Sequence, residues 1–217
     1  KDLAGEIVLK HYATSSAYIG LHFTSYDDFI YPPVIKEEVL KAETTDQGHV
    51  TVYLSHYSDE VVISALQKIK DVRFEVFSKK VKSVITLANV TLFPISNTGF
   101  TKSMIHSKGV ITGAGFETPA EALYLGKQLL CLPIRGQYEQ LCNAAALKDF
   151  GVTIIDKISN DFTQQVYQWL QTSAAKQLSL THSTYEIVQY AIELGRSLQP
   201  AKKEDSLLNE EDLLALF

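Results

Sequence analysis

The feature that most constrains the fold is a run of residues, 109–151, in which short apolar segments alternate with helical ones. The first apolar segment, 110–112, has the length of a buried strand and ends at a Gly-Ala-Gly turn. A second apolar segment, 129–132, leads through a proline and a loop to a helical stretch at 138–150. This order of elements predicts an α/β fold, a Rossmann-like parallel sheet with helices on both faces.

The helix between the two apolar segments has recognisable ends. Thr118 is a suitable N-cap, Pro119 suits the first helical position, and Glu121 completes a Thr-x-x-Glu capping box. Gly126 suits the position just after the helix, where left-handed backbone is common. Ligands of parallel sheets bind at the carboxyl ends of the strands, so we expect the Gly-Ala-Gly turn to face a ligand.

The composition excludes several classes of protein. The 217 residues are 46% hydrophobic and 21% charged, which is typical of a globular domain. The net charge of −5 and the lack of a dense Lys/Arg cluster argue against nucleic acid as a partner. No apolar run approaches the roughly 20 residues of a membrane span. Cys131 and Cys142 have no metal-ligand spacing, and we expect both to be buried free thiols.

The sequence divides into four parts. Residues 1–35, with a strand at 17–23, look like the end of another unit, which the resemblance described below implies is the tail of an otherwise missing N-terminal acceptor domain. Because the chain does not begin with Met, we expect it to be processed or to be part of a longer protein. Residues 36–48, rich in charge and Thr, are expected to form a linker. Residues 49–200 form the predicted main domain, and 201–217 form a polar C-terminal tail that ends in an amphipathic helical pattern.

Within the main domain the hydrophobic patterns predict further strands and helices. We expect strands at 49–54, 72–77, 90–95 and 152–155, and helices at 59–70, 100–107, 161–173 and 183–197. Residues 79–90 fit both the strand and the helix period.

The Gly-Ala-Gly turn is a candidate phosphate site. Gly113, Ala114 and Gly115 would place a helix N-terminus at a strand end, where free N–H groups and the helix dipole favour an anion. A plain tight turn explains the same residues equally well. The pattern is not G-x-G-x-x-G, so dinucleotide binding has little support. Glu121 also has two explanations, the capping box and a carboxylate that accepts hydrogen bonds from ribose hydroxyls.

Two further groups of polar residues follow predicted strands. Gln137, Gln140 and Asn143 recur every three residues, so their amides lie along one side of a helix and suit either sugar hydroxyls or solvent. Ser55 and His56 lie in a polar turn after the first strand of the domain, where a functional role competes with simple exposure. The His, Asp and Glu residues show no familiar metal-binding spacing, so we expect no metal site.

At residues 112–144 the sequence, TGAGFETPAEALYLGKQLLCLPIRGQYEQLCNA, resembles a known family. It is similar to the C-terminal, nucleotide-sugar-binding domain of GT-B glycosyltransferases, especially the family 28 type. The resemblance covers about residues 31–197 and is most specific in the 109–151 block, where the order and spacing of the motifs agree.

The resemblance implies a set of donor-binding residues. They are Ser55, His56, Ile95, Phe100, Gly113, Ala114, Gly115, Glu121, Gln140 and Asn143. The glycine-rich turn would lie near the donor phosphates, Glu121 would hold the ribose, and Gln140 would lie near the sugar. The loop 93–97 would lie along the nucleobase. The family's Gly-Ser phosphate loop is replaced here by Ser-His-Tyr-Ser at 55–58, which departs from the pattern.

The resemblance implies sugar transfer from a nucleotide diphosphate sugar, with UDP favoured, to an acceptor held by a missing N-terminal domain. The donor would be a substrate and no cofactor is expected, while the catalytic base would belong to the other domain. The implied location is the cytoplasm, with peripheral association at the inner face of the membrane through the missing domain as a further option. Two alternatives stay open: a nucleotide-sugar 2-epimerase or hydrolase of the same fold, and a non-catalytic subunit that binds a partner.

Overall fold

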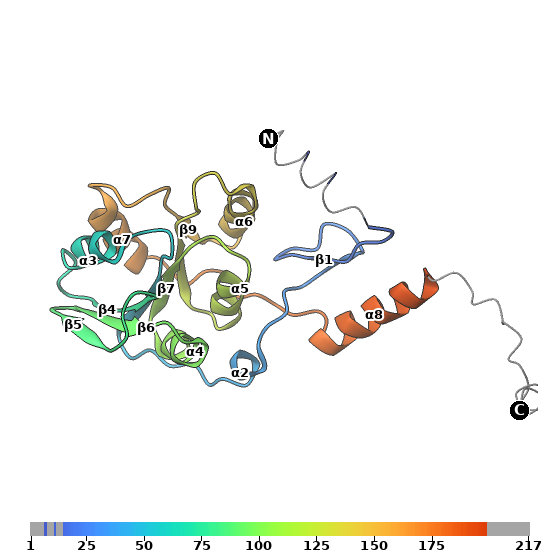
Figure 1. Cartoon of the computed structure of the whole chain (residues 1–217), viewed down its shortest axis with the longest axis horizontal. Helices are drawn as coiled ribbons and strands as arrows, with labels where there is room; N and C mark the ends of the chain where they lie inside the picture. The colour runs from blue at the N-terminus through green and yellow to red at the C-terminus, as the bar shows by residue number, and fades with distance from the viewer. Residues whose placement is uncertain (1–6, 8–10, 12–14, 199–217) are drawn as a thin grey trace, which may run out of the picture.

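The structure, a computed structural model, describes residue 7, residue 11 and residues 15–198 (Figure 1). Its centre is a seven-stranded sheet with the strand order β5-β6-β4-β3-β7-β8-β9. The strands are β3 (His49–Tyr53), β4 (Arg73–Ser78), β5 (Ile85–Leu87), β6 (Val90–Pro94), β7 (Gly109–Thr112), β8 (Gln128–Cys131) and β9 (Thr153–Ile154). All neighbours pair in parallel except β5 and β6. The predicted parallel α/β sheet is confirmed.

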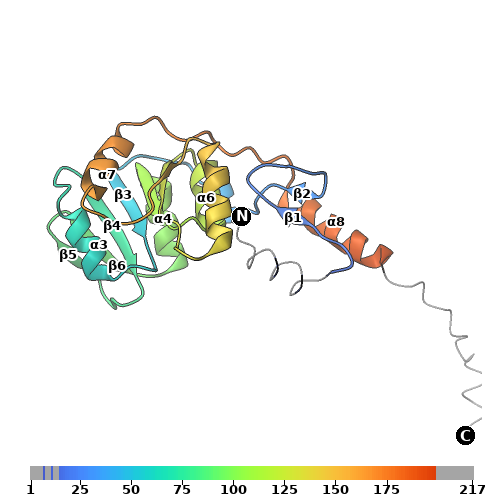
Figure 2. The same ribbon diagram turned by 90° about the horizontal axis from the view of Figure 1, so that it is seen from above.

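Helices cover both faces of the sheet, as Figures 1 and 2 show. One face packs on α4 (Asn97–His106), α5 (Glu117–Tyr124) and α6 (Tyr138–Lys148), and the other on α3 (Asp59–Leu66) and α7 (Phe162–Leu170). Side chains alternate along each strand, so Val110 contributes to the first core and Ile111 to the second. Strands buried on both faces have continuous apolar sequences, which explains why β7 and β8 could be predicted from the sequence.

The ambiguous segment 79–90 contains the antiparallel edge strand β5 and the turn that joins it to β6. Asn89 fixes this turn, because its side-chain amide donates hydrogen bonds to the carbonyl oxygens of Leu66, Ile69 and Val72 at 3.2, 2.8 and 2.9 Å. The turn also contains Ala88 in a left-handed conformation, with φ of 56°. The strand expected at 17–23 is much shorter than predicted.

The segment expected to be a linker packs against the domain. It contains the short helix α2 (Glu37–Leu40), whose Val39 is completely buried. The ammonium of Lys127, itself buried, donates hydrogen bonds to the carbonyl oxygens of Thr45 and Ser107, both at 2.8 Å. Burial lowers the pKa of Lys127, with Asp46 opposing this effect. The division of the chain at this segment stays a prediction.

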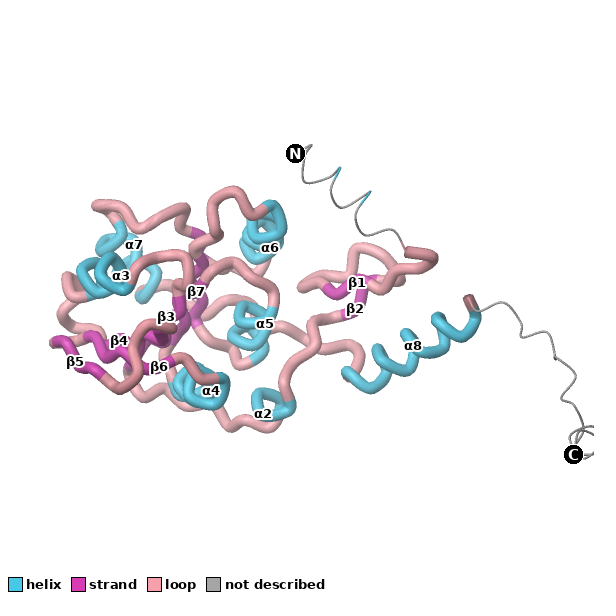
Figure 3. Tube along the Cα trace, in the orientation of Figure 1, coloured by secondary structure: helices cyan, strands magenta, loops and turns pink. Residues whose placement is uncertain are grey.

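A small outer unit lies beside the main sheet. It consists of β1 (Gly20–Leu21), β2 (Ile30–Tyr31) and α8 (Thr184–Ser197), which lie side by side in Figures 1 to 3. The Tyr31 ring contacts the rings of His182 and Tyr190 at centroid distances of 5.0 and 5.5 Å. The chain therefore enters and leaves the main domain at neighbouring points. The predicted tail, 201–217, lies outside the described residues.

The structure corrects two local predictions. Helix α5 begins at Glu117 with Phe116 as N-cap and no side-chain cap, so Thr118 lies inside the helix and the predicted capping box does not form. Cys142 is exposed, because α6 turns Asn143 and Ala144 toward the core, whereas Cys131 is buried as expected. The prediction that Gly126 follows a helix is confirmed by its φ of 68°.

Candidate functional site

The strand order reverses between β3 and β7. From β3 the chain builds β4 and β6 on one side and then returns to build β7, β8 and β9 on the other. The helices that follow β3 and β7 therefore leave in opposite directions, and a crevice opens at the carboxyl ends of these two strands. A cavity of about 270 Å³ lies there.

The cavity is lined by residues from both strand ends and from the turns that follow. They are Tyr53, Ser55, His56, Thr112, Gly113, Gly115, Phe116, Glu117, Thr118, Pro119, Ile134 and Gln140. Five predicted site residues are brought together here, namely Ser55, His56, Gly113, Gly115 and Gln140. We call this space the switch-point cavity.

The turn after β7 is held by side chains of α6. The Gln140 Oε1 atom accepts hydrogen bonds from the backbone N–H groups of Ala114 and Ile134 at 3.1 and 3.0 Å. Its Nε2 atom donates to the Gln137 Oε1 atom at 2.8 Å. The buried Asn143 donates to the Ala114 carbonyl oxygen at 3.2 Å. Two amides thus fix the turn, and one of them also fixes the loop after β8.

These contacts determine which backbone N–H groups of the turn can bind an anion. The N–H group of Ala114 already donates to Gln140, so it is not directed at a ligand in this structure. The first turn of α5, with Glu117 and Thr118, lines the cavity, and helical N–H groups at this position have no partner within the helix. Gly115 leaves open space, since a Cβ atom there would meet no atom within 4 Å. An anion would therefore be held mainly by the helix N-terminus.

The turn after β3 forms the opposite wall. Ser55 and His56 are exposed and line the cavity, and the rings of His56 and Tyr57 lie 4.3 Å apart. The Tyr57 hydroxyl accepts a hydrogen bond from the Ile158 N–H at 3.1 Å. Ser58 caps α3 by accepting a hydrogen bond from the Val61 N–H at 3.4 Å. The His56 ring is nevertheless partly covered, and this partial burial lowers its pKa, which favours the neutral form at pH 7.

Glu121 lies apart from the switch-point cavity. Its side chain is 3% exposed, and its carboxylate forms an ion pair with the ammonium of Lys36 at 3.2 Å. Burial raises the pKa of Glu121, and the neighbouring Lys36 opposes the rise. Glu121 instead lines a smaller cavity of about 230 Å³ next to β1. Its predicted contact with ribose stays a prediction.

The two apolar site predictions also lie outside the switch-point cavity. Ile95 is partly exposed, whereas Phe100 is buried between Tyr53 and Phe77, at ring distances of 6.0 and 5.3 Å. A separate cavity of about 470 Å³ beside α4 is lined in part by Phe93, from the loop expected to lie along the base.

Some residues that line the switch-point cavity were missed in the sequence. Tyr53 and Thr112 are the last residues of β3 and β7, and their position at strand ends was the signal that could have identified them. Glu117 was missed because α5 starts one residue before the predicted cap.

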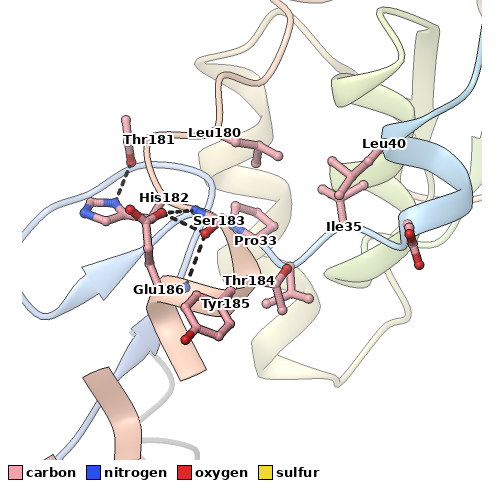
Figure 4. A pocket seen from close by; sticks show the side chains of 12 residues that line it. Pro33, Ile35, Leu40, Leu180, Thr181, His182, Ser183, Thr184, Tyr185 and Glu186 are labelled. Atoms are coloured by element: carbon pink, nitrogen blue, oxygen red, sulfur yellow. Dashed lines mark hydrogen bonds between the residues drawn. The ribbon is translucent and has the colours of Figure 1, made fainter. Parts of the chain in front are cut away.

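A larger cavity of about 700 Å³ lies where the segment 33–40 meets the start of α8 (Figure 4). Its polar groups are largely engaged: Ser183 and Glu186 form a reciprocal capping box, and Thr181 bonds to His182 at 3.0 Å. None of the predicted site residues lines it.

In the part of the chain that the structure describes, no three His, Cys, Asp or Glu side chains are grouped as a metal ion would require. No helix within the described residues is long and apolar enough to cross a membrane.

Comparisons with known proteins agree with this fold. The sequence model of glycosyl transferase family 1 matches residues 8–172. A search of curated proteins found no match.

Several solved structures are similar to the chain. CalG4, the calicheamicin glycosyltransferase, has a TM-score of 0.52 at 14% identity, with 91% of this chain and 60% of that chain covered. MurG of Acinetobacter baumannii has a TM-score of 0.51 at 17% identity, with 81% and 58% covered. The glycotransferase of kitacinnamycin has a TM-score of 0.52 at 14% identity, with 69% and 44% covered. At such identities the likeness concerns the fold. The chain spans about half the length of these proteins.

Proposed function

The chain belongs to glycosyl transferase family 1, and on this premise we propose that it is the donor-binding part of a GT-B glycosyltransferase. The reaction would transfer a sugar from a nucleoside diphosphate sugar, with UDP as the nucleotide, to an acceptor. The observation that carries this proposal is the switch-point cavity, which combines a helix N-terminus with two polar turns at the carboxyl ends of β3 and β7.

The chemistry of the cavity suits a diphosphate leaving group. As the bond between sugar and phosphate breaks, negative charge grows on the diphosphate, and fixed N–H dipoles stabilise that charge without having to reorganise. The first turn of α5 would supply these dipoles, and the Ser55 hydroxyl and the His56 imidazole would donate from the other wall. The side-chain amide of Gln140 would face the sugar end.

The acceptor and the base that deprotonates it would lie in an N-terminal domain that precedes this chain. Positioning both substrates in line supplies a large part of the rate of a transfer reaction. We therefore expect these 217 residues to bind donor without transferring sugar, and the protein that includes the N-terminal domain to restore transfer. The proposed location is the cytoplasm, free or at the inner face of the membrane, and no cofactor is proposed, because the donor is a substrate.

A thermal-shift screen tests the proposal. UDP and UDP-sugars should raise the melting temperature more than ADP or GDP, since a ligand at about 100 times its dissociation constant adds roughly 2.7 kcal/mol to the free energy of unfolding. Equal stabilisation by all nucleotides would refute the assignment of uridine. Stabilisation by none would favour the partner-binding alternative, and chromatography of products from the longer protein would separate transfer from epimerisation.

A matched pair of variants tests the position of the site. Gly115→Asp places a carboxylate in the cavity at a position where a Cβ atom meets nothing within 4 Å, so it should repel the diphosphate while leaving the fold intact. Gly195→Asp makes the same change at an equally open glycine on α8. Loss of the UDP-induced shift in the first variant alone is the expected result, and an equal shift in both would place the nucleotide elsewhere.

A further inference from the structure

One edge of the main sheet carries exposed apolar side chains. Strand β5 forms this edge, at the opposite end of the molecule from α8 (Figures 1 and 3). The side chains of Val84, Ile85 and Leu87 are 56%, 41% and 39% exposed. Ile85 and Leu87 are two residues apart in the strand, so they lie on the same face of the sheet. We call these three residues the edge strip.

Exposed lysines flank the edge strip at both of its ends. They are Lys68, Lys70, Lys79, Lys80 and Lys82. The last three precede the strip in the chain, in the loop that leads from β4 to β5. The first two lie near its other end, because the hydrogen bonds of Asn89 hold the turn after β5 against residues 66–72. Apolar side chains are thus placed between two groups of positive charge.

The charge of these lysines is largely free to act on a partner. Among the residues that the structure describes, none of the five forms an ion pair. The pKa of Glu60 is lowered by hydrogen bonds from its own backbone N–H and from Ser58, and further by the nearby charge of Lys80. Residues 59–90 include six basic and four acidic residues, whereas the whole chain has 20 basic and 25 acidic ones. This end of a negatively charged protein is therefore locally positive.

The usual role of lysines at a sheet edge does not account for the edge strip. Lysines within an edge strand prevent it from pairing with other chains. Strand β5, however, consists of Ile85, Thr86 and Leu87 and contains no charged residue. None of the four cavities described above is lined by the edge strip, so it has no groove there to receive side chains of a protein partner. An exposed edge of this kind favours a flat, negatively charged partner.

We propose that the edge strip and its five lysines dock on an anionic lipid surface. The apolar side chains enter the boundary between headgroups and acyl chains, while the ammonium groups remain at the level of the headgroups. Apolar burial and attraction to anionic lipid add to one another, and each lysine near such a surface contributes to binding. The inference does not depend on donor binding. It places the chain itself on the membrane, without help from an N-terminal domain.

Sedimentation with lipid vesicles tests the role of charge. The 217 residues should bind vesicles of phosphatidylcholine with about 30% phosphatidylglycerol, and should not bind phosphatidylcholine alone. Binding should fall at least about tenfold between about 0.05 and 0.5 M salt, because salt screens the attraction. The double variant Lys79→Gln, Lys82→Gln should bind about 10- to 30-fold more weakly. The control is Lys108→Gln, Lys148→Gln, which removes the same charge at exposed positions away from β5 and should bind like wild type.

A matched pair of valines tests the insertion of the edge strip. Val84→Ser should weaken vesicle binding, whereas Val188→Ser on α8, where Val188 is 47% exposed, should not. For a direct readout, Val84→Cys and Val188→Cys are each labelled with an environment-sensitive fluorophore in a Cys142→Ser background, since Cys131 is buried. Anionic vesicles should shift the emission to the blue only for the label at position 84.

Every outcome bears on the lipid surface. Equal binding to neutral vesicles would refute the role of the lysines, and equal losses in the control variants would place the contact elsewhere. No binding to either kind of vesicle would overturn the proposal in favour of an acidic protein segment as the partner. Because thermal shifts with UDP are measured without lipid, they should be the same in all these variants. A failure here therefore leaves the proposed function in place.

Discussion

The two turns that wall the switch-point cavity are built in different ways. The turn after β7 is fixed from outside, by Gln140 and Asn143 of α6, and its central N–H already has a partner. The turn after β3 is capped by its own Ser58 and tied through the Tyr57 hydroxyl to the Ile158 N–H, and it exposes Ser55 and His56 to the cavity. The turn after β7 therefore supplies a rigid frame, and the turn after β3 supplies side chains that can respond to a ligand.

The comparison separates stability from binding. A substitution that breaks the frame should affect both the fold and the ligand, because the same hydrogen bonds set the shape of the wall. A substitution among the exposed side chains should affect the ligand alone, since exposed residues away from packing contacts change stability little.

The largest effect is expected at Gln140. Gln140→Ala removes the acceptor of two backbone N–H groups, in a partly buried position, and should lower the free energy of unfolding by about 1–3 kcal/mol and weaken UDP binding. Gln140→Glu keeps the acceptor but adds negative charge beside the cavity. Urea unfolding and calorimetry should show a nearly normal fold with weak UDP binding for this variant. Normal UDP binding in Gln140→Ala would show that the Gln140 side chain does not set the shape of the binding wall.

A smaller effect is expected at the helix starts. Ser58→Ala should lower the free energy of unfolding by about 1 kcal/mol, because it removes the cap of α3. Thr118→Ala should change it by less than about 0.5 kcal/mol, since Thr118 lies inside α5 and caps nothing. Equal losses in urea unfolding would mean that the predicted Thr118 cap exists after all.

The smallest effect is a dependence of affinity on pH. His56 is the titrating residue, and its pKa is lowered by burial in the free protein. A bound diphosphate would raise this pKa again, so affinity for UDP-glucose should increase severalfold as the pH falls below about 6.5. The sugar nucleotide is the better probe, because the terminal phosphate of UDP itself titrates near pH 6.

A control variant accompanies this measurement. His56→Ala should bind UDP-glucose with the same affinity across the range, and a pH dependence that survives in it would point to another titrating group of the cavity. The stability of the free protein should have the opposite dependence on pH from the affinity for UDP-glucose. Because the folded state holds the His56 proton less tightly than the unfolded state, this residue makes the protein slightly less stable as the pH falls through 6.5.

The parts of the structure that the sequence predicted well depend on short-range patterns. The strands β7 and β8 are continuous apolar runs bounded by glycine or proline, and their burial on both faces follows from that composition. The amides of Gln140 and Asn143 were predicted to lie along one side of a helix, and the spacing of three residues was enough for this.

The parts that were missed depend on contacts between distant segments. Glu121 has a complete capping-box pattern, yet its partner is Lys36, which lies 85 positions earlier and is brought near by the packing of α2. The exposure of Cys142 follows from the rotation of α6 about its axis, which is set by its contacts with the turn after β7. Periodicity within one helix does not determine either of these.

The position where the chain enters and leaves the main domain also has a mechanical consequence. Tyr31 lies against His182 and Tyr190, so the two connections run side by side rather than at opposite ends of the sheet. A pulling force applied through both connections would act first on these ring contacts. It would separate β1 and β2 from α8. The parallel strands would carry little shear until that unit had separated.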